Sequence, residues 1–376
     1  MRKIQMVDLH SQYEKIKSEI DEAISDVIKS TAFIKGAKVG EFASELASYL
    51  DVKHVIPCGN GTDALQIAIM SLGLKPSDEI ICPDFTFIAS AEVIGLLGYR
   101  PVFVDVDYDS FNVTAKNIEQ AISIKTKAII PVHLFGQAAP MEAILEIAKK
   151  YDLYVIEDTA QAIGADYIFS DGRKQKLGTI GTIGCTSFFP SKNLGCYGDG
   201  GALFTDDDEL AERLKMIANH GMKVRYHHDI LGVNSRLDTI QAAILSTKLK
   251  YLDRYEQARQ EAAKKYDEAF EDIDDLVIPK KEIFSTHVYH QYTLKVKNGK
   301  RDDLRTFLEQ NDIPSMVYYP VPLHKQKAFL PIARQGGALN ISETLAEQVL
   351  SLPMHTELDE EQQTYIICKV REFFNK

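Results

Sequence analysis

The stretch HVIPCGNGTDALQIAIMSLG, residues 54–73, contains the pattern that determines the fold of this chain. A short apolar run, HVIPC, is followed by a glycine-rich turn and then by a helical segment, TDALQIAIMSLG. The order of strand, glycine turn and helix is typical of α/β proteins built on a parallel sheet.

The same alternation continues outward from this stretch to about residue 158. Further strand-like runs, each next to a helical segment, are EIICP, RPVFVDV, KAIIPVHLF and LYVIED. These runs are almost continuously apolar, as in strands that helices cover on both faces. Two later runs, GCTSFF and GGALFT, extend the pattern. We therefore predict a large α/β domain with a mixed, mainly parallel sheet of at least five strands, sandwiched by helices.

The pattern changes after residue 237. A long amphipathic segment, 237–270, predicts a helix, and the strand-like HVYHQYTLKV, the helical RDDLRTFLEQND and a C-terminal helix follow it. We interpret residues 241–376 as a smaller α+β domain and residues 1–240 as the N-terminal segment with the large domain. The first forty or so residues are predicted to be helical and to pack on the smaller domain or at a subunit interface.

The composition excludes several classes of protein. The 376 residues are 45% hydrophobic and 26% charged, and the net charge of −11 argues against a nucleic-acid binder. No segment resembles a signal peptide or is long and apolar enough to cross a bilayer. The five cysteines are scattered without a CxxC pair, which predicts reduced thiols in a cytoplasmic protein, and no metal-binding signature is present.

The turn GNGTDA, residues 59–64, is a candidate phosphate site. Backbone N–H groups at a glycine-rich helix start bind phosphate, and the helix dipole contributes. The same residues match the dinucleotide pattern G-x-G-x-x-G/A, with Asp84 as a candidate ribose-binding acid. A tight turn without a ligand is the third interpretation.

Two adjacent acids, Glu157 and Asp158, end the strand in LYVIEDTAQAIGA. Ligands of α/β proteins bind at the carboxyl ends of parallel strands. Because side chains alternate along a strand, one of the two acids is expected to face such a site. The alternative is that Asp158 caps a helix formed by TAQAIGA.

The segment FFPSKNLGCYGDGGA, residues 188–202, places one amine, Lys192, in a flexible turn between two predicted strands. A lysine near apolar surface has a lowered pKa and becomes a nucleophile towards carbonyls, whereas most lysines are solvated loop residues. Phe85 and Phe87 lie where they could stack on a planar ring or belong to the core. A lysine, an aspartate, a phosphate cup and an aromatic ring favour pyridoxal phosphate over NAD as the cofactor.

These motifs resemble one family along nearly the whole chain. The segments GNGTDALQ, PDFTFIASAE, IEDTAQAIGA, TSFFPSKNLGCYGDGGA, NHG and GVNSRLDTIQAA occur in the order seen in the DegT-type nucleotide-sugar aminotransferases. The resemblance implies a fold-type-I, aspartate-aminotransferase-like enzyme that uses pyridoxal 5'-phosphate. It also implies a homodimer whose two active sites are shared across the interface.

The resemblance assigns roles to individual residues. Lys192 is expected to bond to the cofactor, Asp158 to pair with its ring nitrogen, and Gln161 to lie beside its phenolic oxygen. The expected phosphate ligands are Gly61, Thr62, Ser187 and, from the neighbouring subunit, Asn234. Phe87 is expected to stack on the ring, with Phe85 as the alternative. Arg236, Tyr318, Tyr319 and His324 are expected to contact the substrate, Arg236 through a carboxylate.

The implied reaction moves an amino group from L-glutamate to a UDP-linked keto-sugar. The implied acceptor is the 3-keto group of UDP-2-acetamido-2-deoxy-3-oxo-D-glucuronate, in lipopolysaccharide O-antigen synthesis. Alternatives are a 4-keto-sugar aminotransferase, a sugar dehydratase, an NAD-dependent oxidoreductase using GNGTDA, and a regulator that binds a sugar nucleotide. Lys192 argues against a dehydratase, in which histidine replaces it. Two departures from the family pattern are Tyr318, in place of histidine, and the polar segment 166–182.

Overall fold

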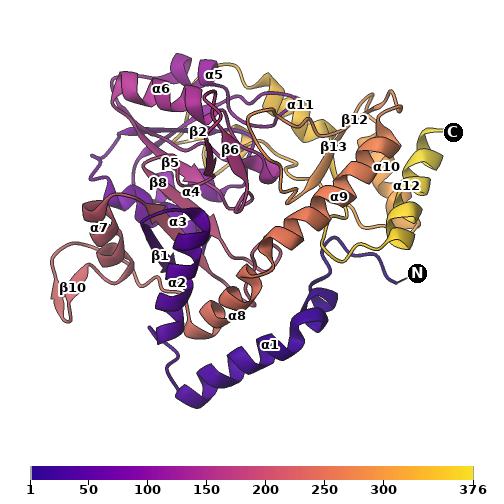
Figure 1. Cartoon of the computed structure of the whole chain (residues 1–376). Helices are drawn as coiled ribbons and strands as arrows, with labels where there is room; N and C mark the ends of the chain where they lie inside the picture. The colour runs from indigo at the N-terminus through magenta and orange to yellow at the C-terminus, as the bar shows by residue number, and fades with distance from the viewer. Residues whose placement is uncertain (1, 376) are drawn as a thin grey trace.

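A computed structural model describes residues 2–375 of the chain, and its largest element is an eight-stranded mixed sheet (Figure 1). In spatial order its strands are β1 (His54–Cys58), β9 (Gly201–Thr205), β8 (Ile183–Ser187), β5 (Tyr154–Asp158), β4 (Thr126–Ile129), β2 (Glu79–Pro83), β3 (Arg100–Val104) and β14 (Arg334–Gln335). From β8 to β14 all neighbours are parallel. Strand β9 runs antiparallel to both β1 and β8. The predicted mixed, mainly parallel sheet is therefore confirmed.

Helices cover both faces of this sheet, and the strand sequences explain why. One face packs on α3 (Gly61–Ser71), α4 (Ala89–Leu96) and α7 (Asp208–Ala218). The other packs on α5 (Ala115–Ala121) and α6 (Met141–Tyr151), and near β1 and β9 on α2 (Ala37–Leu50). In β2, Ile80 and Cys82 contribute to the first core and Ile81 to the second. Because side chains alternate along a strand, a continuous apolar run such as Ile80 to Cys82 can pack on helices at both faces.

The segment predicted as one long helix forms two, α8 (Thr239–Leu249) and α9 (Leu252–Phe270). The N-terminal helix α1 (Leu9–Ser30) lies along α8, where Ile16, Ile20 and Ile244 form a small apolar cluster. Figure 1 shows α1 as an elongated arm at the edge of the molecule. The predicted N-terminal helical region is thus present, and in this chain it packs on α8.

The C-terminal part forms a second core. Its three-stranded sheet contains β12 (Leu276–Val277), β13 (Tyr292–Val296) and β15 (Val349–Leu352), and its helices are α10 (Arg301–Gln310), α11 (Asn340–Gln348) and α12 (Glu360–Phe374). Helix α9 packs on this sheet through Tyr266 and Phe270, while α11 packs on the core of the large sheet. Because β14 also joins the large sheet, contacts cross the predicted boundary at residue 240, which stays a prediction.

Two short hairpins complete the described chain. The polar segment 166–182 contains β6 (Asp166–Ile168) and β7 (Lys174–Lys176), whose Tyr167 packs on Phe284. The second hairpin, β10 (Met222–Val224) with β11 (His227–His228), exposes Val224 and Tyr226. No helix within residues 2–375 combines the length and apolarity needed to span a membrane.

The predicted helix in TAQAIGA is absent, so the helix-capping alternative for Asp158 is wrong. Residues 160–164 form turns. Gly164 adopts a positive φ of +92°, and a Cβ there would lie 1.7 Å from Glu256 Oε1. A left-handed residue stops a right-handed helix, and glycine adopts that conformation without steric cost. The chain therefore turns directly into β6.

Candidate active site

A cavity of about 460 Å³ opens at the carboxyl ends of β5 and β8. It is lined by loops from distant parts of the chain, which the parallel sheet brings to one edge. The predicted site residues among its lining are Gly61, Thr62, Phe87, Asp158, Gln161, Ser187, Lys192, Tyr318 and Tyr319. Their shared location is a result of folding, because they span more than 250 positions of the sequence.

The N-terminus of α3 forms one end of the cavity. Asn60 caps the helix by accepting a hydrogen bond from the N–H of Asp63 (2.8 Å). Gly61 packs so closely on Ser187 that an added Cβ would lie 2.6 Å from the Cβ of that serine. The first N–H groups of a helix have no partner within it, and together with the helix dipole they favour an anion. This end of the cavity can therefore hold a phosphate between α3 and the end of β8.

The adjacent acids at the end of β5 face opposite sides of the sheet, as alternation predicts. Asp158 lines the cavity and accepts hydrogen bonds from the Ser90 hydroxyl (2.7 Å) and the N–H of Ala160 (3.1 Å). Glu157 is completely buried, and its carboxylate instead accepts hydrogen bonds from backbone N–H groups of residues 178–181. The cavity therefore receives one fixed carboxylate from this strand.

Lys192 lies in the loop between β8 and β9, in a turn closed by its N–H and the carbonyl of Phe189 (2.8 Å). Burial lowers the pKa of the Lys192 amine to about 8, while the Asp158 carboxylate opposes that shift. An amine with such a pKa is partly unprotonated near neutral pH, which a nucleophile or a proton acceptor requires. Lys248 holds this loop in place, because its Nζ donates a hydrogen bond to the carbonyl of Gly195 (2.6 Å).

Aromatic and amide side chains form the other wall. Gln161 donates through Nε2 to the Tyr319 hydroxyl (3.0 Å) and accepts through Oε1 from the N–H of Phe135 (2.7 Å). Phe87 is 53% exposed and lies 6.1 Å, ring centre to ring centre, from Tyr319. Phe85, the alternative stacking residue, is 1% exposed and belongs to the core. Of the two phenylalanines, Phe87 is the one that a planar ring in this cavity could reach.

Three of the predicted residues do not line this cavity. Asn234 and Arg236 lie in the segment before α8, and Arg236 borders a separate groove together with Lys35. His324 is bound at its Nδ1 to Asp84 Oδ2 (2.7 Å) and at its Nε2 to Glu343 (3.1 Å). Within this chain, none of the three is brought to the lysine.

The pair of Asp84 and His324 has a structural position that the sequence did not suggest. Asp84 also accepts the backbone N–H of His324 (2.7 Å), and burial raises the pKa of its carboxyl against these hydrogen bonds. Asp84 precedes Phe87, and His324 follows Tyr319, so the pair joins the two chain segments that supply the aromatic rings of this wall. Its carboxylate is therefore not available to a ribose, as the dinucleotide alternative requires.

Several lining residues were missed by the sequence analysis. Among them are Asn60, Thr86, Phe189, Asp199, His290 and Gln291. His290 and Gln291 directly precede β13, and their segment was interpreted as strand alone. A strand pattern carries no signal of which cavity the residues before it border, whereas Asn60 could have been recognised as a helix cap before GTDA.

A family model for the DegT/DnrJ/EryC1/StrS aminotransferases matches residues 14–371. The chain belongs to this family. Aminotransferases of the family depend on pyridoxal phosphate, and the anion-binding helix start, fixed carboxylate and low-pKa lysine of the cavity fit that cofactor. When bound, it would be held by Gly61, Thr62, Ser187, Asp158 and Lys192. Among the described residues no cluster of three potential metal ligands occurs.

Three relatives cover nearly the full length. The chain is 48% identical to a pleiotropic regulatory protein of Geobacillus stearothermophilus (99% of this chain, 98% of the relative). It is 46% identical to UDP-2-acetamido-2-deoxy-3-oxo-D-glucuronate aminotransferase of Pseudomonas aeruginosa (95% and 96%). It is 44% identical to UDP-N-acetyl-3-dehydro-alpha-D-glucosamine 3-aminotransferase of Acidithiobacillus ferrooxidans (98% and 97%).

Solved structures agree with this assignment. A family aminotransferase from Brucella abortus is 42% identical, with a TM-score of 0.94 over 99% of this chain and all of that one. The protein ntda from Bacillus subtilis, solved with bound cofactor PMP, is 30% identical, with a TM-score of 0.89 over 100% of this chain and 86% of that one. The expected fold type I is therefore confirmed.

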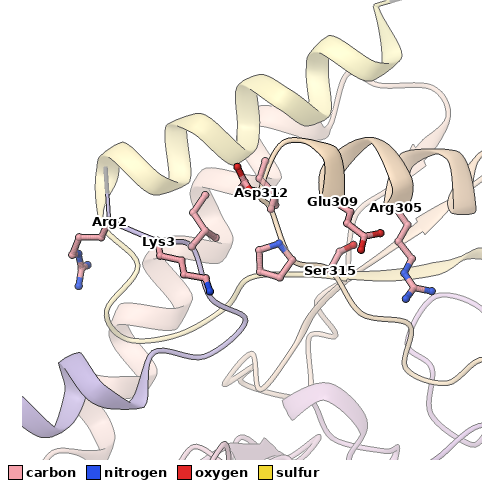
Figure 2. A pocket seen from close by; sticks show the side chains of 9 residues that line it. Arg2, Lys3, Arg305, Glu309, Asp312 and Ser315 are labelled. Atoms are coloured by element: carbon pink, nitrogen blue, oxygen red, sulfur yellow. The ribbon is translucent and has the colours of Figure 1, made fainter.

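Figure 2 shows a larger cavity, of about 620 Å³, whose lining does not include Lys192. It is bordered by Arg2 and Lys3 of the N-terminal segment and by Arg305 and Glu309 of α10. None of the predicted site residues borders it, and both charge signs occur along its rim. Volume alone therefore does not identify the active site of this chain.

Proposed function

We propose that the protein transfers the amino group of L-glutamate to the 3-keto group of UDP-2-acetamido-2-deoxy-3-oxo-D-glucuronate. The observation that carries this proposal is the meeting of Lys192 and Asp158 with the α3 N-terminus in one cavity. The choice of sugar is supported by the two relatives named for 3-keto-sugar amination, both of which carry UDP. We place the reaction in the cytoplasm and in O-antigen synthesis, because nucleotide sugars are the precursors of surface polysaccharides.

Pyridoxal phosphate, when bound, supplies an electron sink for the carbanion formed at the amino donor and carries the amino group. We assign to Lys192 Nζ the removal of the proton from the α-carbon of the donor, for which its lowered pKa is suited. We assign to Asp158 the pairing with a protonated ring nitrogen, which is supported by the hydrogen bond that anchors its carboxylate to Ser90. Phe87 and Gln161 would orient the ring, and the start of α3 its phosphate.

The charges of the cavity support a shared site. Among the described lining residues the charged side chains are Asp158, Asp199 and Lys192. The uronate carboxylate of the acceptor is an anion, and this lining contains no arginine to pair with it. We therefore propose a homodimer in which Asn234 and Arg236 of one subunit complete the site of the other, Asn234 at the phosphate and Arg236 at the uronate carboxylate.

A second acceptor, UDP-N-acetyl-3-dehydro-glucosamine, is favoured by one specific observation. It lacks the uronate carboxylate, and the lining of the cavity within this chain contains no arginine. The two acceptors differ only at C6, so the role of Arg236 decides between them.

The test offers the purified protein both UDP-3-keto-sugars and a UDP-4-keto-sugar, each with L-glutamate, and identifies the products by mass spectrometry. We expect preferential amination of the uronate, and Arg236→Gln should raise its KM while leaving that of the glucosamine derivative nearly unchanged. Lys192→Ala serves as the inactive control. Preferential amination of the glucosamine derivative would select the second acceptor, equal activity on both 3-keto-sugars would refute the role of Arg236, and turnover of the 4-keto-sugar alone would refute the proposal.

A further inference from the structure

His290 borders the active-site cavity, and its imidazole ring is not fully hydrogen-bonded. The residue is 5% exposed, and its Nδ1 is enclosed without a hydrogen-bond partner among residues 2–375. Leaving a buried polar atom without a hydrogen-bond partner destabilises the folded state, because the atom has lost its hydration without gaining a replacement. Native proteins retain few such atoms, and those retained call for a functional explanation.

The ring is uncharged in this environment. Burial holds the pKa of His290 well below its usual range, and the positive charges of Lys192 and Arg259 lower it further. A neutral imidazole has one nitrogen that donates and one that accepts a hydrogen bond. Because its pKa lies so low, the ring is suited to hydrogen bonding rather than to proton transfer at neutral pH.

The backbone that carries His290 is fixed on two sides. Arg259 Nη1 donates to the carbonyls of Tyr289 (3.0 Å) and His290 (3.4 Å). Asn193, the neighbour of Lys192, donates through Nδ2 to the carbonyl of Val288 (3.0 Å). The lysine loop and the wall with His290 are thus tied together one residue from the lysine. The separation between the two side chains is therefore set by the fold.

We propose that His290 is a positioning residue for Lys192, whose amine donates a hydrogen bond to a ring nitrogen of His290 whenever the lysine is not bonded to the cofactor. The proposal rests on the role of Lys192 in the proposed function. No hydrogen bond joins the two side chains in the present arrangement, so the proposal requires the flexible four-carbon stem of the lysine to rotate until the amine reaches the ring. A fixed acceptor would keep the amine directed into the cavity during the proton transfer.

The other groups around the amine do not offer an equivalent acceptor. Asp158, on β5, is held by Ser90 and Ala160 and is reserved in the proposed function for the ring nitrogen of the cofactor, and Tyr319 is engaged with Gln161. Asp199 and Tyr318 also line the cavity, Asp199 as an exposed residue of the same loop. His290 differs from these in being both enclosed and unpaired.

The test measures the titration of Lys192 in the full-length protein after removal of the cofactor. Pulse labelling of amines with acetic anhydride between pH 6 and 10, followed by peptide mass spectrometry, gives the pKa of this lysine. His290→Phe keeps the ring volume and removes the acceptor, and we expect it to lower the Lys192 pKa by about one unit, because a hydrogen bond accepted from an ammonium favours the charged form. His290→Asn and His290→Gln retain an acceptor near Nδ1 and Nε2, and at least one of them should restore the value.

A control variant distinguishes a direct effect of His290 on Lys192 from a general disturbance of the segment that carries His290. His287 lies on the same segment, and its Nδ1 already accepts the N–H of Tyr289 (3.0 Å). His287→Phe should leave the Lys192 titration unchanged. Equal titration curves for His290→Phe and the unmodified protein, or equal shifts in both variants, would overturn the proposal. If His290→Phe does not fold, loss of the normal titration in both the Asn and Gln variants overturns it as well. Labelling requires no turnover, so inactivity towards keto-sugars with normal labelling would count only against the proposed function.

Discussion

Replacing Glu157 by glutamine tests whether the buried acid next to Asp158 has a purely structural role. Its Oε1 accepts the N–H groups of Ile180 (2.7 Å) and Gly181 (2.5 Å). Its Oε2 accepts the N–H of Gly178 (3.0 Å) and lies 2.9 Å from His133 Nε2.

His133 cannot change its tautomer to accept a hydrogen bond from a glutamine at position 157. His133 Nδ1 accepts the N–H of Ala139 (3.1 Å), so the proton is on Nε2, which donates to the glutamate. All four partners of Glu157 are therefore donors. The amide nitrogen of a glutamine must face two of them, and each unpaired buried donor costs about 1–3 kcal/mol.

We expect Glu157→Gln to lower the free energy of unfolding by about 4 kcal/mol, the middle of the range for two unpaired donors. With an unfolding entropy of about 2.1 cal/mol/K per residue, this corresponds to a melting temperature roughly 5 °C lower. Differential scanning calorimetry measures it. Glu146→Gln, on the exposed side of α6, should change the melting temperature by less than about 1 °C. A Glu157→Gln variant that melts within 1 °C of the parent would refute this account of the buried acid.

Three further substitutions test the site, and a fourth tests a buried acid elsewhere. Asp158→Asn, which can keep both hydrogen bonds of the side chain, should reduce turnover at least about hundredfold with little change in melting temperature. A clearly lower melting temperature together with the lower turnover would contradict the role assigned to Asp158. Lys192→Ala should abolish amino transfer while the cofactor still binds, as its visible absorption will show; loss of binding would indicate a different role. Asp84→Ala should raise the KM for the sugar about tenfold or more by releasing the wall with Tyr319, and Asp84→Asn should do so less, as steady-state kinetics will measure. Burial raises the pKa of Glu256 to about 8 from 4.5, so the folded protein retains a proton between these values that the unfolded chain has released, and stability falls as pH rises through this window. Glu256→Gln should therefore flatten the melting profile between pH 5 and 8, and an unchanged slope would exclude this acid as the cause.

Local patterns in the sequence were sufficient for the fold class and for the centre of the site. Continuous apolar runs separated by helical segments predict buried parallel strands, because each run can pack on both faces. Asp158 was recognisable as an acid at the end of such a run, and Lys192 as a single amine in the turn between two of them. Alternation along the strand required that Glu157 and Asp158 point to opposite faces, and the structure agrees.

The tertiary structure decided which residues form the walls of the cavity around the lysine. Asp84 and His324 are 240 positions apart, and each was assigned to a ligand until folding placed them 2.7 Å from one another. His290 carries no local signal, because its position depends on Arg259 and Asn193, which come from other elements. Local propensity is encoded within a few neighbouring residues, whereas a contact between distant segments depends on how all the layers pack. The sequence alone therefore determined the chemistry at the strand ends, and only the packing of the loops determined the walls around it.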